Sequence, residues 1–312
     1  MILKTQEMVY STLTDRVGNM LFQIAAGASL AYKNSSDFIA CVSETTVPDG
    51  TRLIEYLKPF KNNIFRNIKI VEGIPEDSVE FNQQGFEYSP IPYQENILLK
   101  GYFQSEKYFD KNFIKNLFAI DSSSYEYIEN KYGHLLKQDI ISIHVRRGDY
   151  VKRPLRQPVC EMPYFKRAIR FFGKSRQFLI VSDDIEWCKK KFKGENFHFT
   201  QNESPIIDLY IQSLCAHNII SNSSFSWWGA WLNSNESKIV IAPKKWFGVQ
   251  MKSYNLSDLI PDNWIKIDNP RTPSLQIKIF FYWFIDVFKR IRRRATGIFQ
   301  YLYLNIKHFR KL

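Results

Sequence analysis

The chain carries, at residues 141–150, the sequence Ile-Ser-Ile-His-Val-Arg-Arg-Gly-Asp-Tyr, an apolar, β-branched run that ends abruptly in charged residues. Such a run predicts a buried strand, and ligands of open α/β sheets bind beyond the carboxyl ends of strands. Arg146 and Arg147 stand at that end, and a guanidinium pair can hold diphosphate oxygens bidentately without losing its charge. A surface turn with solvated charges is the alternative, but the flanking His144, Asp149 and Tyr150 favour a binding site.

From residue 138 onward the sequence alternates between strand-like and helix-like patterns. The predicted strands cover residues 140–145, 178–181, 197–200, 218–221 and 238–242, and the predicted helices cover 162–173, 185–192, 206–217 and 225–233. This alternation predicts a parallel sheet with right-handed crossovers, which is a Rossmann-like nucleotide domain. Because Gly-x-Gly-x-x-Gly and P-loop patterns are both missing from it, neither a dinucleotide fold nor a P-loop is indicated.

The first part of the chain is less regular. A helix is predicted from Gly18 to about Tyr32, a strand over 38–42, a helix over 51–60 that ends near Pro59, and a strand from residue 97 that turns into a helix. A charged helix over 110–132 should end at Gly133. The domains predicted are therefore 1–134, 135–270 and a tail, 271–312, while residues 61–92 read as variable loop and short strands.

The formal net charge of +12 is concentrated in the tail. Residues 271–312 hold ten Lys and Arg and a single acid, Asp286, whereas the first 270 residues are nearly balanced. This distribution argues against nucleic-acid binding by the body of the protein. The four cysteines lie far apart without paired spacing, so we expect free buried thiols and no zinc or disulfide framework.

A second polar constellation covers residues 221–232, Ser-Asn-Ser-Ser-Phe-Ser-Trp-Trp-Gly-Ala-Trp-Leu, and should open a helix. Hydroxyls and free backbone N–H groups at a helix N-terminus form an anion site, so Ser223, Ser224 and Ser226 can hold phosphate oxygens. The three tryptophans are more often core anchors than ligand stackers.

These stretches resemble glycosyltransferase family 11, the α-1,2-fucosyltransferases, and specifically its bacterial members. Residues 144–150 match the pattern His-x-Arg-Arg-x-Asp-Tyr, and residues 222–232 match a third signature of the family almost letter for letter. The opening at Gly18, Asn19 and Phe22 resembles the pattern Gly-x-x-Gly-Asn-x-x-Phe, but Asp15 replaces the first glycine and brings a carboxylate to the cleft or to solvent. The resemblance runs from Gly18 to Trp264.

The resemblance implies an α/β fold of GT-B type, in which an acceptor-side domain and a nucleotide-sugar domain, both Rossmann-like, face a cleft. It implies inverting, metal-independent transfer of L-fucose from GDP-β-L-fucose to the 2-hydroxyl of a terminal galactose-type acceptor, without a cofactor, in surface polysaccharide or lipopolysaccharide biosynthesis. One rival is a GDP-fucose transferase of another linkage. A rival of another class is a non-catalytic, basic, membrane-associated binding protein.

Under this reading the donor diphosphate would be held by fixed positive charge and dipoles. Its ligands would be Arg146, Arg147, Ser223, Ser224, Ser226 and Phe225 beside them. Arg147 would also be catalytic, and Asp149 is the first choice for the general base, with His144 the second. The alternatives are that His144 holds the guanine or its ribose and that Asp149 orients an arginine.

The remaining candidates sit at other strand and helix ends. Asp183 or Asp184 could accept hydrogen bonds from guanine N1–H and N2–H, although a helix cap is an equal alternative. Asn19, Gln104 and Tyr150 would face the acceptor or the cleft, with helix capping the alternative for Asn19 and a rim position for Gln104.

The tail reads as a strongly amphipathic cationic helix from residue 275 to 291, followed past Gly297 by a second basic segment. Lying on an anionic leaflet would satisfy both faces of such a helix, and packing on the N-terminal domain is the alternative. The first ten residues have no apolar signal region, and no run is long enough for a membrane span. We therefore expect a cytoplasmic protein that is peripheral on the inner membrane.

Overall fold

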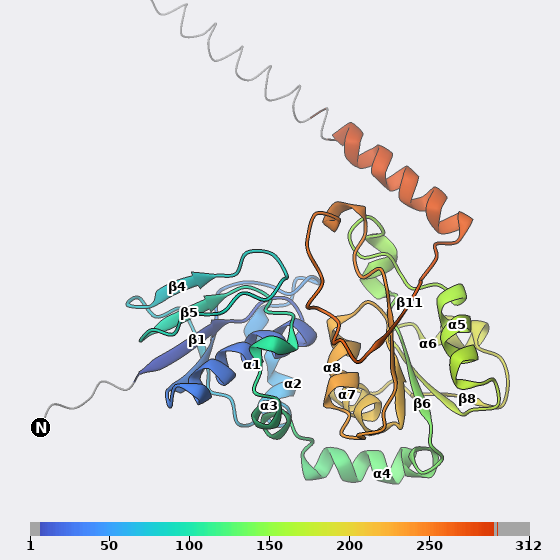
Figure 1. The fold of residues 1–312 in the computed structure, drawn as a ribbon, viewed down its shortest axis with the longest axis horizontal. Coiled ribbons are helices and arrows are strands. Elements are labelled where there is room, and N and C mark those ends of the chain that lie inside the picture. Colours follow the sequence, from blue (N-terminus) through green and yellow to red (C-terminus); the bar gives the residue numbers. More distant parts are fainter. Residues whose placement is uncertain (1–6, 290–291, 293–312) are drawn as a thin grey trace, which may run out of the picture.

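The computed structural model describes residues 7–289 and 292. Its first domain contains a five-stranded parallel sheet with the order β3-β2-β1-β5-β4 (Figure 1). The strands are β1 (Met8–Thr12), β2 (Asp37–Val42), β3 (Ile70–Glu72), β4 (Val79–Asn82) and β5 (Ile97–Lys100). The central strand, β1, was not predicted, whereas β2 and β5 confirm the predicted strands.

The second domain contains a six-stranded parallel sheet with the order β11-β10-β9-β6-β7-β8. Its strands are β6 (Ile141–Val145), β7 (Phe178–Ser182), β8 (Phe197–Phe199), β9 (His217–Ile219), β10 (Val240–Pro243) and β11 (Ile265–Ile267). Counted from β6, this is the Rossmann order 3-2-1-4-5-6, which reverses direction between β6 and β9. Two Rossmann-like domains facing a cleft confirm the expected GT-B-type fold.

Helices cover both sheets, and several differ from their predicted limits. They are α1 (Val17–Lys33), α2 (Leu53–Lys61), α3 (Lys111–Leu117), α4 (Ser122–Leu136), α5 (Met162–Phe172), α6 (Ile185–Lys191), α7 (Pro205–Leu214) and α8 (Ser224–Leu232), with short 3-10 turns η1 (Glu106–Tyr108), η2 (Gly148–Lys152) and η3 (Val249–Met251). α2 continues past Pro59, because a proline in the last turn removes only one intrahelical bond and the buried Phe60 holds that turn on the core. The single helix predicted over 110–132 is two helices, because Asp110 and Asp121 each accept a backbone N–H as an N-cap. α4 then runs through Gly133, so the predicted domain boundary falls in its last turns.

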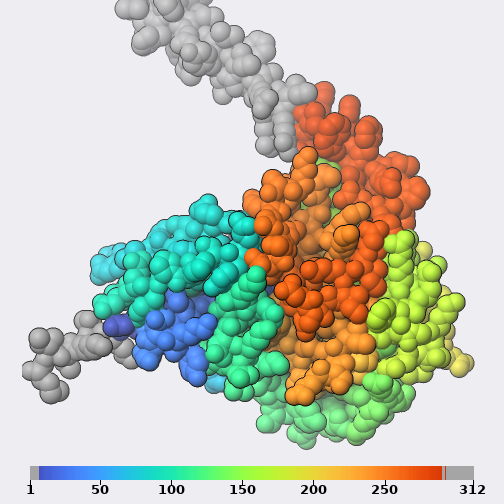
Figure 2. All heavy atoms as spheres, viewed as in Figure 1, coloured from blue at the N-terminus to red at the C-terminus, as the bar shows by residue number. Residues whose placement is uncertain are grey.

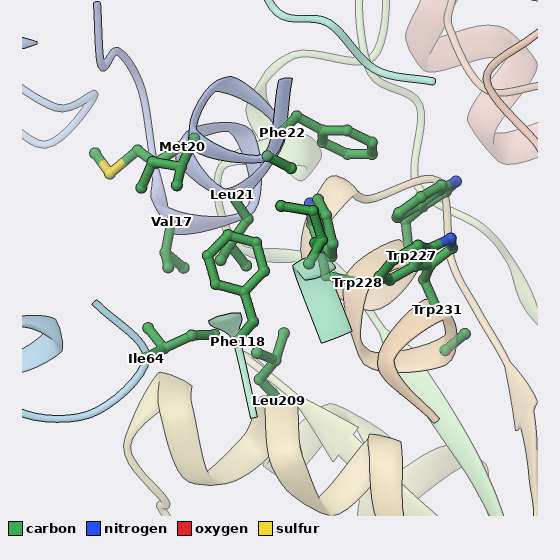
Figure 3. Packing of buried hydrophobic residues seen from close by; sticks show 14 of the residues in the cluster. Val17, Met20, Leu21, Phe22, Ile64, Phe118, Leu209, Trp227, Trp228 and Trp231 are labelled. Atoms are coloured by element: carbon green, nitrogen blue, oxygen red, sulfur yellow. The ribbon is translucent and has the colours of Figure 1, made fainter. Parts of the chain in front are cut away.

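The two domains share one apolar core. Phe22 of α1 lies 4.5 Å from Trp227 and 4.9 Å from Trp228 of α8, measured between ring centroids, and Figure 3 shows these side chains meeting between the helices. Phe109 and Phe118, from the first part of the chain, also contact Trp228. Trp227 and Trp228 are therefore core anchors, as predicted, and they join the domains. The four cysteines are buried and free, which confirms the expectation for them.

A further helix, 273–289, extends along the outside of the second domain (Figures 1 and 2). Its buried residues Leu275 and Ile279 pack with Leu155, and Gln250 donates to Asp286. The described part of the tail therefore packs on the second domain. The predicted alternative was packing on the N-terminal domain, and these contacts do not support it. The second tail segment predicted past Gly297 lies outside the described residues. Within residues 7–289, no helix has the length and apolar character that a membrane crossing requires.

Candidate active site

A cavity of about 540 Å³ lies between the domains, where the carboxyl ends of the strands of one sheet face those of the other. The second domain contributes residues that follow β6, β7 and β9, and the first contributes residues that follow β1 and β5. In the second sheet β6 and β9, and in the first sheet β1 and β5, flank the point where the strand order reverses, which is where open α/β sheets bind ligands. The predicted site residues that line the cavity are Asn19, Gln104, His144, Arg146, Asp149, Tyr150, Asp183, Ser223, Ser224 and Phe225.

Arg146 is the cationic centre of the second-domain wall. Its guanidinium bonds to Asp183 Oδ2 at 2.9 Å and to Asp149 Oδ1, and it lies 5.3 Å from the centre of the Tyr150 ring. Asp149 also lies 3.8 Å from an Arg153 nitrogen. The guanidinium is thus held in one orientation by charge-assisted bonds while it faces the cavity.

A side chain at Gly148 would displace the Asp183 carboxylate from its place beside Arg146. A Cβ atom there would lie 2.4 Å from Asp183 Oδ2, closer than any real contact. Tyr150 donates from its hydroxyl to the Asn222 carbonyl at 3.2 Å, which ties the loop after β6 to the loop after β9. Burial raises the pKa of Tyr150 to about 12, so this hydroxyl keeps its proton.

Arg147 and Asp184 do not line the cavity, contrary to the prediction for both. The Arg147 side chain donates from Nε to Asp184 Oδ2 at 2.9 Å, and its guanidinium lies 4.0 Å from the centre of the Trp187 ring. Asp184 also accepts the Trp187 backbone N–H as the N-cap of α6, the capping alternative left open by the sequence. The two residues fasten α6 to the loop after β6.

His144 lines the cavity but is a poor proton acceptor. Its ring nitrogen Nδ1 lies 2.8 Å from the Ser221 hydroxyl, and Phe225 packs 5.5 Å away. Burial, with a smaller effect of the Arg146 charge, lowers the pKa of His144 to about 3. A neutral histidine of such low basicity does not suit the role of general base, the second choice from the sequence, and fits hydrogen bonding to a ligand instead.

The N-termini of two helices converge on the cavity. Ser223 is the N-cap of α8, its side chain makes no capping bond, and it lines the cavity with Ser224 and Phe225. From the other domain, α1 approaches so closely that a Cβ atom on Gly18 would lie 2.6 Å from the Phe225 backbone nitrogen. Both helix dipoles therefore direct their positive ends at one space.

Ser226 is a correction to the predicted phosphate ligands. Its side chain is fully buried, and its hydroxyl donates to the carbonyls of Ser221 at 3.2 Å and Ser223 at 3.1 Å. It therefore closes the turn before α8 and does not reach the cavity.

The first-domain wall is a chain of polar side chains. Tyr102 donates to Asp15 Oδ2 at 2.7 Å, Asn19 donates to the same oxygen at 3.3 Å, and Gln104 donates to Asn19 Oδ1 at 2.8 Å. Gln104 Oε1 is buried and has no hydrogen-bond partner among the described residues, so it is an acceptor available to a ligand. Arg16, and not Asn19, is the N-cap of α1, so the capping alternative for Asn19 is wrong.

Asp15 has a backbone φ of +61° and lines the cavity. A glycine adopts this conformation without strain. This explains why the family pattern has its first glycine at position 15. The carboxylate that this chain places there faces the cleft.

Asp208 is a site residue that the sequence did not reveal. It lies in α7, lines the cavity, and keeps a buried Oδ1 without a partner in the described part of the chain. Burial raises the pKa of Asp208 to about 7, although a hydrogen bond from Thr200 favours its ionised form. No motif or strand end marks this position, whereas Arg153 and Arg156, which also line the cavity, directly follow the predicted arginine stretch.

The cavity can therefore hold an anion against Arg146 and the α8 N-terminus, opposite a wall of hydrogen-bonding groups suited to hydroxyls. Among residues 7–289, no group of three or more His, Cys, Asp or Glu side chains is placed to bind a metal ion.

Comparison with known proteins finds similar sequences and a similar solved structure. An alpha-1,2-colitosyltransferase of Escherichia coli is 28% identical over 294 residues, which are 84% of this chain and 99% of that protein. The O-antigen biosynthesis glycosyltransferase WbnK of Escherichia coli is 40% identical over 136 residues, but the match spans only 40% of this chain and 44% of WbnK. The crystal structure of the fucosyltransferase NodZ from Bradyrhizobium covers 72% of this chain and 92% of its own, with a TM-score of 0.48 at 14% identity.

The sequence model of glycosyl transferase family 11 matches residues 2–268. The match contains both sheets and every residue named above as lining the cavity. The chain therefore belongs to glycosyl transferase family 11.

Proposed function

We propose that the protein transfers L-fucose from GDP-β-L-fucose to the 2-hydroxyl of a terminal galactose-type acceptor, with inversion and without a metal ion. The observation that carries the proposal is the cavity itself. It combines a fixed guanidinium, Arg146, and two helix N-termini with an opposite wall of neutral and acidic acceptors. A departing diphosphate needs concentrated positive charge, and a sugar acceptor needs hydrogen-bonding partners.

The donor lies along the second domain in this proposal. Arg146 and the Ser223–Ser224 turn bind the diphosphate, and their preorganised charge stabilises it as the glycosidic bond breaks. Asp208 receives guanine N1–H and N2–H, because its Oδ1 has no partner in the part of the chain that the structure describes, while Asp183 already accepts bonds from Arg146 and from the Arg147 backbone N–H. Neutral His144 holds the ribose or the base.

The acceptor approaches from the first domain. Asp149 remains our proposed general base, since it is the carboxylate of the arginine loop that lines the cavity and His144 is too weakly basic. Its ion pair with Arg146 means that it also orients the donor ligand. Gln104 Oε1 and Asp15 supply acceptors for the sugar hydroxyls.

The biological setting is part of the proposal. Surface polysaccharide or lipopolysaccharide synthesis is supported by the likeness to WbnK, which is named for O-antigen biosynthesis. The enzyme would act on the cytoplasmic side, peripheral on the inner membrane. Transfer of colitose is a second candidate, supported by the relative that matches 84% of the chain and is an alpha-1,2-colitosyltransferase.

The test is a transfer assay in EDTA with a β-galactoside acceptor and GDP-fucose, GDP-colitose, GDP-mannose or UDP-galactose as donor. We expect fucose α-linked to the galactose 2-position, identified by NMR, and loss of product in Arg146→Ala. Asp149→Asn should lower kcat about a hundredfold or more with a smaller change in GDP affinity. Product from GDP-colitose alone would select the second candidate, and a requirement for added metal would overturn the metal-free mechanism.

A further inference from the structure

Helix 273–289 exposes a continuous apolar stripe. Five of its residues are between 56% and 71% exposed, which are Ile277, Phe280, Phe281, Phe284 and Phe288. Their spacing of three, four, seven and eleven residues from the first places all five on one side of a helix. Exposed large apolar residues normally occur singly, so a stripe of this size marks an interaction surface.

The stripe points away from the protein. The opposite side of the helix carries Leu275 and Ile279, which are buried with Leu155, and Asp286, which accepts from Gln250. An ordinary surface helix buries its broad apolar face and exposes its polar one. This helix buries only a narrow apolar side and exposes its broader one, and Figures 1 and 2 show it standing outside the body of the second domain.

The charges beside the stripe indicate what covers it. Lys278 and the exposed Lys289 flank the apolar face, and residues 271–312 hold ten basic residues and one acid. Trp283 is 47% exposed, and tryptophan favours the boundary between lipid and water. Two copies of the chain would bring like charges together, whereas anionic lipid headgroups would neutralise them.

We infer that helix 273–289 lies in the interface of an anionic lipid bilayer, with Phe280, Phe281 and Phe284 inserted at the acyl boundary. Such helices bind through buried aromatic area together with electrostatic attraction.

The position of this helix brings the bilayer to the mouth of the cleft. A groove of about 300 Å³ separates the helix from residues 152–156 and is lined by Lys152, Arg153, Arg156, Tyr282 and Lys289 among others. Arg153 and Arg156 line the active-site cavity as well. Resting on the proposed function, the inference adds that the acceptor is a saccharide carried on a lipid in the same bilayer.

Vesicle co-sedimentation tests the docking without any reaction. We expect the full chain to sediment with phosphatidylglycerol-containing vesicles, less with phosphatidylcholine alone, and less as salt rises. The double variant Phe280→Ser/Phe284→Ser should bind about a hundredfold more weakly, because two aromatic rings lose their burial. Phe171→Ser removes an exposed phenylalanine of α5 and is the matched control, expected to bind like the wild type. Failure of the wild type to bind, or a dimer that the double variant abolishes, would overturn the inference.

Transfer to two acceptors tests the consequence. The double variant should keep wild-type rates with a soluble β-galactoside and lose about tenfold or more with a galactose-terminated lipid in vesicles. Equal rates of variant and wild type on the vesicle acceptor would refute delivery from the membrane. Absence of transfer to either acceptor, with vesicle binding intact, would instead refute the proposed function and leave the docking surface standing.

Discussion

Arg146 and Arg147 are adjacent in the chain, yet their side chains serve different parts of the molecule. Arg146 faces the cavity between Asp149 and Asp183, whereas Arg147 stacks on Trp187 and bonds to Asp184. Both follow the same strand, so the sequence could predict an anion site there. It could not predict which arginine enters the site, because that depends on the turn into η2.

The two arginines should therefore respond differently to substitution. Arg146→Ala is expected to weaken GDP binding by about 2 kcal/mol or more, since a charge-assisted contact is lost and two carboxylates lose their guanidinium partner. Arg146→Lys keeps the charge, so its affinity for GDP should lie between those of the wild type and Arg146→Ala. In Arg147→Ala, the matched control, GDP affinity should change little while the Tm drops. Isothermal titration calorimetry measures the affinities, and equal losses in both alanine variants would contradict this assignment.

Asp208 should make GDP binding depend on pH. The pKa of Asp208 is raised to about 7, so its protonated form predominates below that pH and only the ionised form accepts fully from guanine. Affinity for GDP is therefore expected to fall about tenfold from pH 8 to pH 6. The terminal phosphate of GDP also titrates in this pH range. The pH dependence of GDP affinity in Asp208→Asn therefore serves as the baseline.

A comparison of nucleotides completes the Asp208 test. The wild type should prefer GDP to inosine diphosphate, which lacks the N2 amino group, and Asp208→Asn should lose most of that preference. If Asp208→Asn kept the preference for GDP over inosine diphosphate, another residue would have to contact the guanine. The sequence did not reveal Asp208 because it lies within α7, where an acid usually means a solvated face, and only tertiary packing buries it.

At the scale of elements, the approach of α1 to α8 sets the width of the cleft. Gly18→Ala would place a Cβ atom 2.6 Å from the Phe225 nitrogen and 2.8 Å from the Ser224 carbonyl carbon, both of which are backbone atoms. The two helix N-termini would have to separate, which costs about 1–3 kcal/mol of stability. We expect a lower Tm and weaker GDP binding together, because the displaced α8 turn is the diphosphate site in the proposed function.

Gly27→Ala offers a comparison on the same helix. A Cβ atom there would meet the side chains of Ser11 and Phe38, away from α8. It should lower stability while GDP affinity stays near the wild-type value. If both variants weaken GDP equally, the α1–α8 contact is not what positions the site.

Elements were predictable where the local pattern was strong. Strands β6 and β7 match their predictions within a residue, because β-branched runs bounded by polar residues have few alternatives. β1 was missed because its Met-Val-Tyr-Ser-Thr sequence has no strong apolar run, although tertiary context buries its inward positions. β11 has only three residues and was missed for lack of a pattern.

At the scale of the molecule, a shared apolar core joins the two sheet domains. Sequence patterns predicted that Trp227 and Trp228 are buried, but not that they pack against Phe22 from the other domain. Such pairing depends on long-range docking, which local periodicity does not encode. A large apolar interface of this kind resists relative domain motion.

The shared core leads to a prediction about unfolding. Domains that move independently melt separately, but here α1 and α8 bury their aromatic residues in each other, so calorimetry should show one cooperative transition. Phe22→Ala should destabilise the chain by about 3–5 kcal/mol by emptying a site between the domains, and split or broaden that transition. Phe165→Ala removes a phenylalanine buried wholly within the second domain, and should lower the same single transition without splitting it. Two transitions in the wild type would show that the domains unfold independently. The shared core would then not be what fixes the geometry of the cleft, and ligand binding would have to do so.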